Sequence, residues 1–272
     1  MARNRLLIFG LGYAASAVAA RLGDWEVEAT GSAGTLAFDD HDAVVAAIGR
    51  ATHILSSVPP GEGDPVLDGY GAQLGGKWLG YLSSTGVYGD AGGAWVDESA
   101  PIRGRRANRN KADADWLAIG ARVFRLPGIY GPGRSPLDRV RSGEAHRTGI
   151  PGQVFSRVHV EDIASGVLAG FAAPPGAYNL ADDLPAPQDA VVEFAATLLG
   201  IGPPPVVALE TLSPAARAFH AENRRVSNTK AKRVLGWRPF YSDYRLGLRA
   251  LSAMTNPAPA SAAPATASAD QR

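Results

Sequence analysis

The chain has 272 residues, 46% of them hydrophobic, which is enough to bury one large core or two unequal ones without a partner. Its 27 Lys and Arg residues nearly balance 26 Asp and Glu residues, so the composition offers no polyanion-binding surface and excludes nucleic acid as the expected partner. The absence of cysteine excludes disulfides, a thiol nucleophile and zinc–thiolate sites, and the five histidines show no metal-ligand spacing, so no metal is expected.

The first predicted strand begins almost at Met1, which leaves no room for a signal region. No apolar run reaches the length of a membrane span. We therefore expect a cytoplasmic protein that does not associate with membranes.

The most informative stretch is a strand, a glycine-rich turn and a helix near the N-terminus. An apolar run over residues 6–9 meets Gly-x-Gly-x-x-Ala, and an alanine-rich segment with helical spacing follows. Gly10 suits the tight turn, Gly12 lets a diphosphate approach the main chain, and Ala15 is the small residue where helix meets strand. Amides at the helix start would face the phosphates, although an ordinary strand–helix turn is the alternative. The predicted phosphate-binding residues are Gly10, Leu11, Gly12, Tyr13, Ala14 and Ala15.

Strand and helix signals then alternate along the first half of the chain. The expected strands are 25–30, 36–39, 53–58, 78–82 and 122–126, and the expected helices are 41–48, a short helix opening at Asp64-Pro65, and 108–119. This alternation predicts an α/β fold of the Rossmann type, with a doubly wound parallel sheet that binds ligands at the carboxyl ends of its strands.

The rest of the chain predicts a smaller α/β part that binds substrate. We expect a nucleotide-binding domain over 1–165, joined by a strand that returns near 176–181, and an interleaved substrate-binding part over 166–254. Residues 255–272 are almost only Ala, Pro, Ser and Thr, so this segment is predicted to be a disordered tail.

The end of the second predicted strand bears on which dinucleotide the turn would hold. Sites specific for NAD carry an acidic residue here, which binds the ribose 2′-hydroxyl and repels a 2′-phosphate. This chain has Thr30, Gly31 and Ser32, whose hydroxyls and amides suit a phosphate, so NADP is favoured over NAD. Asp39 could reach an adenine. The alternative is that these residues only form a turn.

Six motifs in order resemble the extended short-chain dehydrogenases/reductases, the NAD-dependent epimerase/dehydratase family. They are Gly10-Leu11-Gly12-Tyr13-Ala14-Ala15, Ser83-Ser84-Thr85-Gly86-Val87-Tyr88-Gly89, Arg125-Leu126-Pro127-Gly128-Ile129-Tyr130-Gly131-Pro132-Gly133, Val158-His159-Val160-Glu161-Asp162-Ile163, Tyr178-Asn179-Leu180 and Leu235-Gly236-Trp237-Arg238-Pro239. The resemblance spans residues 5 to about 250, and the glycine motif and short length are most similar to an atypical branch.

The resemblance implies a site that uses a Ser or Thr after the fifth strand and a Tyr and Lys four residues apart on the next helix. Ser84 matches the first position and Lys111 best matches the lysine, which places Ala107 at the tyrosine position. With no phenol there, Tyr88 is the nearest substitute, and a packed aromatic in its turn is the alternative. Lys111 would also bind the nicotinamide ribose, and an exposed helix lysine is its alternative.

Other positions complete the expected site. Ser32, Asp39, Ser57 and Pro127 are expected to contact the cofactor, with Pro127 beside the nicotinamide as the family resemblance implies. Thr85 and Gly86 stand where family dehydratases carry an acidic pair, so dehydration is disfavoured. The cations Arg134, Arg141, Arg147 and Arg157 could meet a phosphate or carboxylate of a substrate, or be solvated surface residues.

The expected function is an NAD(P)-dependent oxidoreductase of the epimerase/dehydratase type, acting on a hydroxyl or carbonyl carbon of a small molecule such as a nucleotide sugar, aldehyde or ketone. The alternative, motivated by Ala107, is a regulatory module that binds NAD(P) without turnover. A small-molecule substrate is the expected partner. The oligomeric state stays open, with a homodimer as one alternative.

Overall fold

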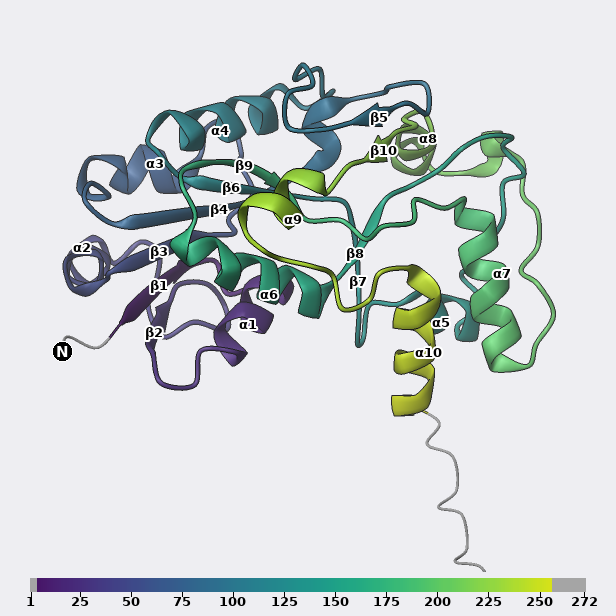
Figure 1. Cartoon of the computed structure of the whole chain (residues 1–272), viewed down its shortest axis with the longest axis horizontal. Helices are drawn as coiled ribbons and strands as arrows, with labels where there is room; N and C mark the ends of the chain where they lie inside the picture. The colour runs from purple at the N-terminus through teal and green to yellow at the C-terminus, as the bar shows by residue number, and fades with distance from the viewer. Residues whose placement is uncertain (1–3, 256–272) are drawn as a thin grey trace, which may run out of the picture.

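A computed structural model describes residues 4–255, and strands alternate with helices along most of this range (Figure 1). The strands are β1 (Arg5–Phe9), β2 (Glu26–Ala29), β3 (His53–Ser56), β4 (Trp78–Ser84), β5 (Trp95–Val96), β6 (Arg122–Leu126), β7 (Gly128–Tyr130), β8 (Arg157–His159), β9 (Gly176–Asn179) and β10 (Arg225–Val226). The helices are α1 (Tyr13–Ala20), α2 (His41–Arg50), α3 (Pro65–Tyr70), α4 (Ala107–Ala118), α5 (Pro136–Arg141), α6 (Val160–Ala169), α7 (Gln188–Leu199), α8 (Pro214–His220), α9 (Thr229–Val234) and α10 (Tyr244–Thr255). Short 3-10 turns lie at Gly71–Gln73, Thr85–Tyr88, Gly170–Ala172 and Leu209–Thr211.

Six strands form one sheet in the order β2-β1-β3-β4-β6-β9, and every neighbouring pair is parallel. Central strands such as β1 read as continuous apolar runs because helices bury both faces of the sheet. The strand order reverses between β1 and β3, so the carboxyl ends of these two strands form the switch point where such folds bind ligands. The predicted doubly wound parallel sheet is confirmed.

The strand expected at 36–39 is not formed, because only a single parallel bridge joins Leu36 to Thr30. Beyond Leu36 the chain turns into the core. The ring of Phe38 packs edge-on against Phe9, and its carbonyl accepts the hydroxyl of Tyr70. Packing therefore takes the place of a β-ladder in this segment.

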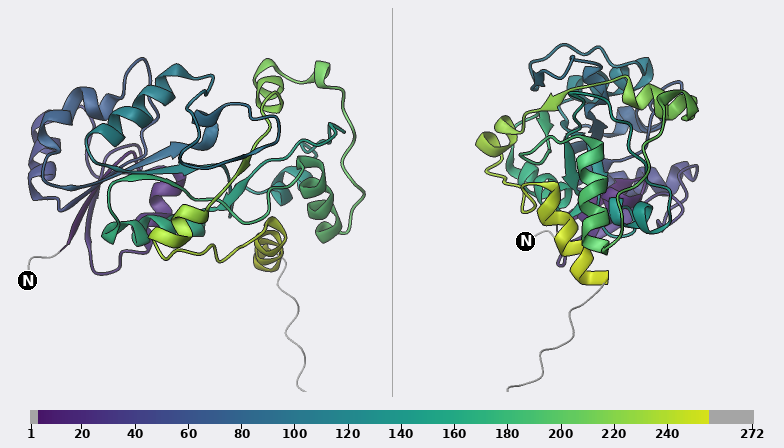
Figure 2. Two further views of the ribbon diagram at one scale, coloured as in Figure 1. Left: turned by 45° about the horizontal axis from the view of Figure 1, so that its top comes forward. Right: turned by 90° about the vertical axis from the view of Figure 1, so that its right-hand side faces the viewer.

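Two helical layers cover the sheet, as the views in Figure 2 show. Helices α1 and α6 pack against each other on one face, over a core that includes Trp78 and Phe124. Helices α2, α3 and α4 cover the other face, where Trp116 of α4 stacks on Tyr81 of β4 with ring centroids 5.4 Å apart.

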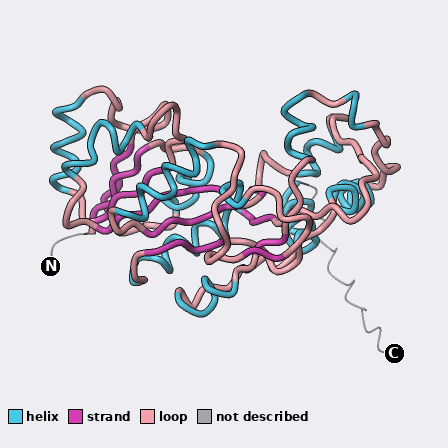
Figure 3. The backbone as a smooth tube through the Cα atoms, turned by 90° about the horizontal axis from the view of Figure 1, so that it is seen from above, coloured by secondary structure: helices cyan, strands magenta, loops and turns pink. Residues whose placement is uncertain are grey.

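A second lobe lies beside the carboxyl ends of the sheet strands (Figure 1, Figure 3). Helices α5, α7 and α10 share a separate apolar cluster drawn from 130–145, 186–196 and 244–251. The parallel pair β7–β8 leads into this lobe. This cluster uses residues on both sides of position 165. The domain boundary expected at residue 165 stays a prediction.

The chain returns from the second lobe to the first near its C-terminal end. Strand β10 pairs in parallel with β5, and the amides of Ala91 and Gly93 both donate to the carbonyl of Asn223. Thr255, where the predicted tail begins, is the last residue of α10, and the rest of that tail lies outside the described residues. No helix within residues 4–255 has both the length and the apolar character that a membrane crossing requires.

Candidate functional site

The turn between β1 and α1 has the geometry that the glycine pattern predicts. Gly10 has φ +81°, and a Cβ there would also lie 3.1 Å from Val58. At Gly12 a Cβ would meet nothing within 4 Å, so this glycine leaves open space above the turn. Ala15 is fully buried where α1 packs on the sheet. Gly10 therefore permits the backbone conformation of the turn, and Gly12 leaves space above it that a ligand could enter.

Only part of this turn is free to bind a ligand. The amides of Gly10 and Leu11 donate to the Thr30 hydroxyl at 3.1 Å and to the Thr30 carbonyl at 2.9 Å. The amide of Gly12 donates to the Gly10 carbonyl at 2.8 Å. Since α1 has no side-chain cap, the amides of residues 13–15 have no acceptor among residues 4–255. The three amides of the first turn of α1 are thus the donors of this turn that remain open to a ligand.

Residues expected near the adenosine half have distinct roles in the structure. Thr30 is buried, and its hydroxyl accepts the Gly10 amide and so holds the turn. The hydroxyl of Ser57 donates to the Gly10 carbonyl and fixes the turn from β3. Ser32 and Asp39 are exposed beyond the end of β2. No acidic residue occupies positions 29–32 at this strand end.

A cavity of about 1000 Å³ opens at the carboxyl ends of β4 and β6, and both Ser84 and Pro127 line it. Ser84 is the last residue of β4, and its Oγ accepts the amide of Gly86 at 3.1 Å. Because that bond occupies a lone pair, the hydroxyl proton stays available to a substrate oxygen in the cavity.

Tyr88 does not reach this cavity, which corrects the expectation that it could replace the missing phenol. Its side chain is 3% exposed, and its hydroxyl donates to Asn179 Oδ1 at 2.8 Å while accepting Arg125 Nη1 at 3.0 Å. Burial raises the pKa of this phenol. Tyr88 therefore packs in the core, the alternative that its turn motif also allowed.

Replacing Tyr88 with Phe tests this placement. The variant should lower the free energy of unfolding by about 1–3 kcal/mol, because Arg125 and Asn179 lose a buried partner. Binding of any ligand in the cavity should be unchanged. Chemical denaturation together with ligand titration measures both, and normal stability with lost ligand binding would contradict the assignment.

Lys111 also lies away from the cavity. Its side chain is 71% exposed on the outer face of α4, and its Nζ lies 2.5 Å from Asp115 Oδ2. The inner face of α4 instead carries Asp113, whose carboxylate accepts the Ser83 hydroxyl at 2.6 Å. One helical turn before Asp113, on the same side of α4, stands Arg109, which lines the cavity with Ser84.

The cavity-lining residues in this region therefore differ from those expected. Arg109 of α4 lines the cavity and Lys111 does not, while Arg105 and Arg106, which precede α4, line it and Ala107 does not. Ala107 is exposed at the start of α4. Guanidinium groups thus occupy the wall where the family resemblance implies a phenol and an ammonium.

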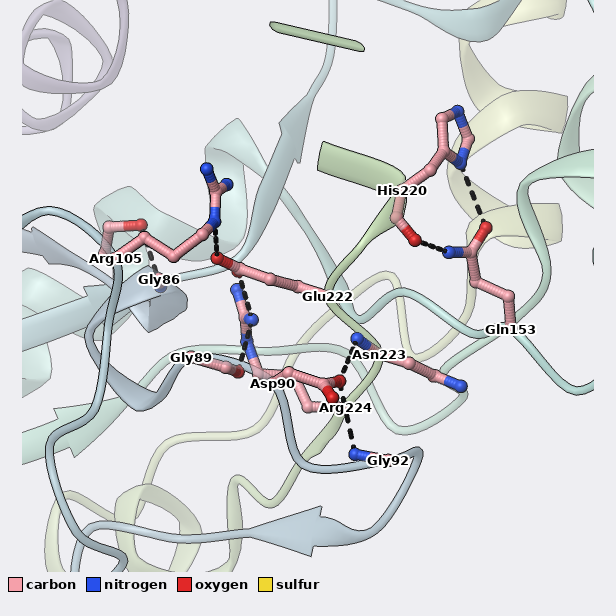
Figure 4. Close-up of polar contacts among 11 residues, drawn as sticks. Gly86, Gly89, Asp90, Gly92, Arg105, Gln153, His220, Glu222, Asn223 and Arg224 are labelled. Carbon is pink, nitrogen blue, oxygen red and sulfur yellow. Dashed lines mark hydrogen bonds and ion pairs between the residues drawn. The ribbon is translucent and has the colours of Figure 1, made fainter. Parts of the chain in front are cut away.

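The far wall comes from the segment between α8 and β10, shown in Figure 4. Glu222 accepts Arg105 Nε at 2.5 Å and Arg224 Nη1 at 2.6 Å, and the two arginines lower its pKa. Arg224 also donates to the Gly89 carbonyl at 2.7 Å. Asp90 accepts the Asn223 amide at 2.8 Å, so this segment is fastened to the turn that follows Ser84.

The four arginines singled out in the sequence separate into two pairs. Arg134 and Arg157 line the cavity. Arg141 lies 3.4 Å from Asp138, and Arg147 lies 2.7 Å from Glu193, both away from the cavity. The first pair is placed to meet a ligand and the second pair forms ordinary ion pairs.

The histidines are structural or lie on the rim. His159 Nδ1 accepts the Glu161 amide at 3.2 Å and caps α6, while burial lowers the pKa of its ring to about 4. His146 and His220 line the cavity. Within residues 4–255, no three His, Asp or Glu side chains lie close enough together to hold a metal ion.

Sequence reasoning missed Arg105, Arg109 and Glu222. One signal could have found Arg109. Arg125 stands inside the apolar run of β6 and requires a buried acid, and Asp113 lies between the core positions Ala112 and Trp116 of α4. With Asp113 fixed inward, helical spacing would have assigned Arg109 to the cavity. Glu222 lies in a segment without periodicity, which gave no comparable signal.

Several solved structures resemble this one over nearly their whole length. A functionally unknown conserved protein from Silicibacter pomeroyi is 41% identical, with a TM-score of 0.82 over 92% of this chain and 99% of that chain. A putative NAD-dependent epimerase/dehydratase from Methylobacillus flagellatus is 23% identical, with a TM-score of 0.72 over 93% and 98%. The human epimerase family protein SDR39U1, solved with NADPH, is 16% identical, with a TM-score of 0.71 over 91% and 99%. No family model matches the sequence, and neither does any curated protein sequence.

Proposed function

Since the chain belongs to the same family as the Silicibacter pomeroyi protein and has the fold of the extended short-chain dehydrogenases/reductases of the epimerase/dehydratase type, we propose that it is an NAD(P)-dependent oxidoreductase. The reaction would exchange hydride with a hydroxyl or carbonyl carbon of a small molecule. One observation carries the proposal. The open turn at Gly12 and the cavity at Ser84 lie along the same edge of one parallel sheet, at the carboxyl ends of its strands.

The turn fits the diphosphate of a dinucleotide. The amides of residues 13–15 have no acceptor among residues 4–255, and Gly12 has no side chain to obstruct the approach of a phosphate to them. Pro127 lines the cavity with Ser84 and would contact the nicotinamide half. When bound, a nicotinamide would supply or accept the hydride. NADP is favoured over NAD because the end of β2 has no carboxylate to repel a 2′-phosphate.

The residues of this chain would act on the substrate oxygen. Ser84 would donate a hydrogen bond to it, since its Oγ already accepts the Gly86 amide. A guanidinium keeps its proton at physiological pH, so neither Arg105 nor Arg109 can replace the family phenol as proton donor. The protein would therefore polarise the substrate, and its proton would come from a group other than these two.

A second function is favoured by this same arginine pair. A protein that binds NADP without turnover, and reports its level to a partner, has no need for a phenol beside Ser84. Both readings require the dinucleotide turn, and they differ only in whether a substrate reacts in the cavity.

Calorimetric titration with NADPH and NADH tests the proposal, followed by turnover assays on aldehydes, ketones and sugars. We expect saturable binding that is tighter for NADPH. We also expect turnover that falls about 10²–10³-fold in Ser84→Ala, the usual loss for one donor to a developing oxyanion. Ser99→Ala, on an exposed loop, is the matched control. Binding with no turnover on any substrate would support the second function, and no binding of either nucleotide would refute both.

A further inference from the structure

The cavity beside Ser84 carries a strong excess of positive charge. Seven arginines and three carboxylates line it, whereas the whole chain has a net charge of only +1. The acids do not balance these cations. Glu222 is shared by Arg105 and Arg224, and Asp138 also pairs with Arg141, which does not line the cavity. The excess positive charge along this cavity is therefore left for a ligand.

Two of the arginines that line the cavity with Ser84, Arg105 and Arg109, have N–H donors without a hydrogen-bond acceptor among residues 4–255. Arg109 is half-buried, and its guanidinium has no hydrogen-bond or ion-pair partner among residues 4–255. Arg105 uses only its Nε on Glu222. Figure 4 shows its two terminal nitrogens turned away from that carboxylate. Each group presents the planar pair of donors that suits a carboxylate or a phosphate.

A third arginine, Arg157, is a buried cation that has no hydrogen-bonded anionic group among residues 4–255 to offset the free-energy cost of its burial. Arg157 is 6% exposed and lines the same cavity from β8. Its hydrogen-bond acceptors are the carbonyls of Phe155 and Ala186 and the amide oxygen of Gln188, all uncharged. Burial lowers the pKa of this guanidinium to about 10. A cation held in this way gains stability when an anion enters the cavity.

The carboxylate of Asp182 does not supply that anion. Both of its oxygens are buried without a hydrogen-bond partner, and burial raises its pKa well above the ordinary value. No hydrogen bond joins it to Arg157 beyond its own backbone amide, which donates to the Arg157 carbonyl at 2.7 Å. Asp182 therefore acts on Arg157 only through space, and the guanidinium has no hydrogen-bonded counter-charge among residues 4–255.

We propose that this cavity is an oxyanion-binding subsite, in which Arg105 and Arg109 hold a carboxylate or phosphate group of the substrate beside Ser84 and Arg157 supplies the charge beneath it. The inference rests on the proposed function only in taking Ser84 as the reacting end. It assigns the substrate to small molecules that carry an oxyanion, because Arg105 and Arg109 line the same cavity as that serine. The cavity has a volume of about 1000 Å³ and is partly open to solvent.

Calorimetry on the full chain with inorganic phosphate and with malonate, at constant ionic strength set by chloride, tests the subsite directly. Wild-type protein should bind at least one probe saturably, and the preferred probe distinguishes phosphate from carboxylate. Arg109→Gln and Arg105→Gln should each weaken this binding about tenfold or more, which corresponds to one lost charged contact. Arg103→Gln is the matched control, because Arg103 is exposed, lies two residues from Arg105 and does not line the cavity.

Loss of the Glu222 pair could disturb the fold in Arg105→Gln, so Arg105→Lys is measured beside it with the melting temperature of every variant. Arg105→Lys should keep the ion pair and bind the probe with intermediate affinity. Failure of wild-type protein to bind either probe would overturn the inference, as would equal weakening in Arg103→Gln. The proposed function is read separately, because NADPH binding without anion binding would overturn only the subsite, and anion binding without NADPH binding would overturn only the oxidoreductase.

Discussion

Replacing Asp113 with Asn is expected to lower the free energy of unfolding by about 3–5 kcal/mol, because it leaves a buried guanidinium without its counter-charge. Asp113 and Arg125 are 1% and 3% exposed. The carboxylate receives Arg125 Nη2 at 2.6 Å, Arg125 Nε at 3.1 Å and the Ser83 hydroxyl at 2.6 Å. An amide keeps the shape of the side chain but not its charge, so the loss reports the electrostatic part of this contact.

Urea denaturation followed by far-UV circular dichroism measures the effect. Asp115→Asn is the matched control, since Asp115 lies two residues away on the same helix and pairs only with the exposed Lys111. That variant should unfold close to the wild-type midpoint. Equal losses in the two variants would mean that the buried pair does not stabilise the fold as its geometry requires.

Replacing Gly12 with Val should weaken dinucleotide binding about 100-fold or more, equivalent to about 2.7 kcal/mol, while leaving the fold intact. A Cβ at Gly12 contacts no protein atom, and its φ of −91° is open to any residue, so the added side chain costs the folded state little. It would nevertheless fill the space in front of the free amides of residues 13–15. The variant therefore separates binding from stability in a way that Gly10, with its positive φ, does not.

Calorimetric titration with NADPH gives the affinity, and thermal unfolding without nucleotide checks the fold. Gly23→Val provides the comparison, because a Cβ at Gly23 also meets nothing within 4 Å and this glycine lies in an exposed turn after α1. Unchanged affinity in Gly12→Val would place the diphosphate elsewhere.

Short-range patterns predicted the sheet well. Apolar runs bounded by turn residues located β1, β3, β4 and β6, and Asp40 and Asp64 mark the starts of α2 and α3 with side chains that accept the first free amides. These signals suffice because each depends on neighbours in sequence. The strand predicted at 36–39 was wrong for the opposite reason. The position of Phe38 depends on a hydrogen bond with Tyr70, which lies 32 residues away in the sequence.

The candidate site was predicted less completely. The glycine turn, Ser84 and Pro127 were identified from local motifs, and the structure brings the latter two to one cavity. The side of α4 that faces inward could not be read from its own sequence, because the helix is polar on most sides. Contacts with Ser83 and Arg125, both on distant strands, orient it through Asp113. That choice of face placed Arg109, rather than Lys111, in the cavity.

The segment around residues 222–226, late in the chain, forms part of the cavity wall. After α7 and α8, the polypeptide comes back so that β10 lies along β5 and Glu222 binds Arg105, 117 residues earlier in the sequence. Helix α10 then completes the second lobe, so segments on both sides of β10 build that lobe. The two halves cannot be separated by a single cut, because any fragment that ends before residue 222 lacks part of the wall around Ser84.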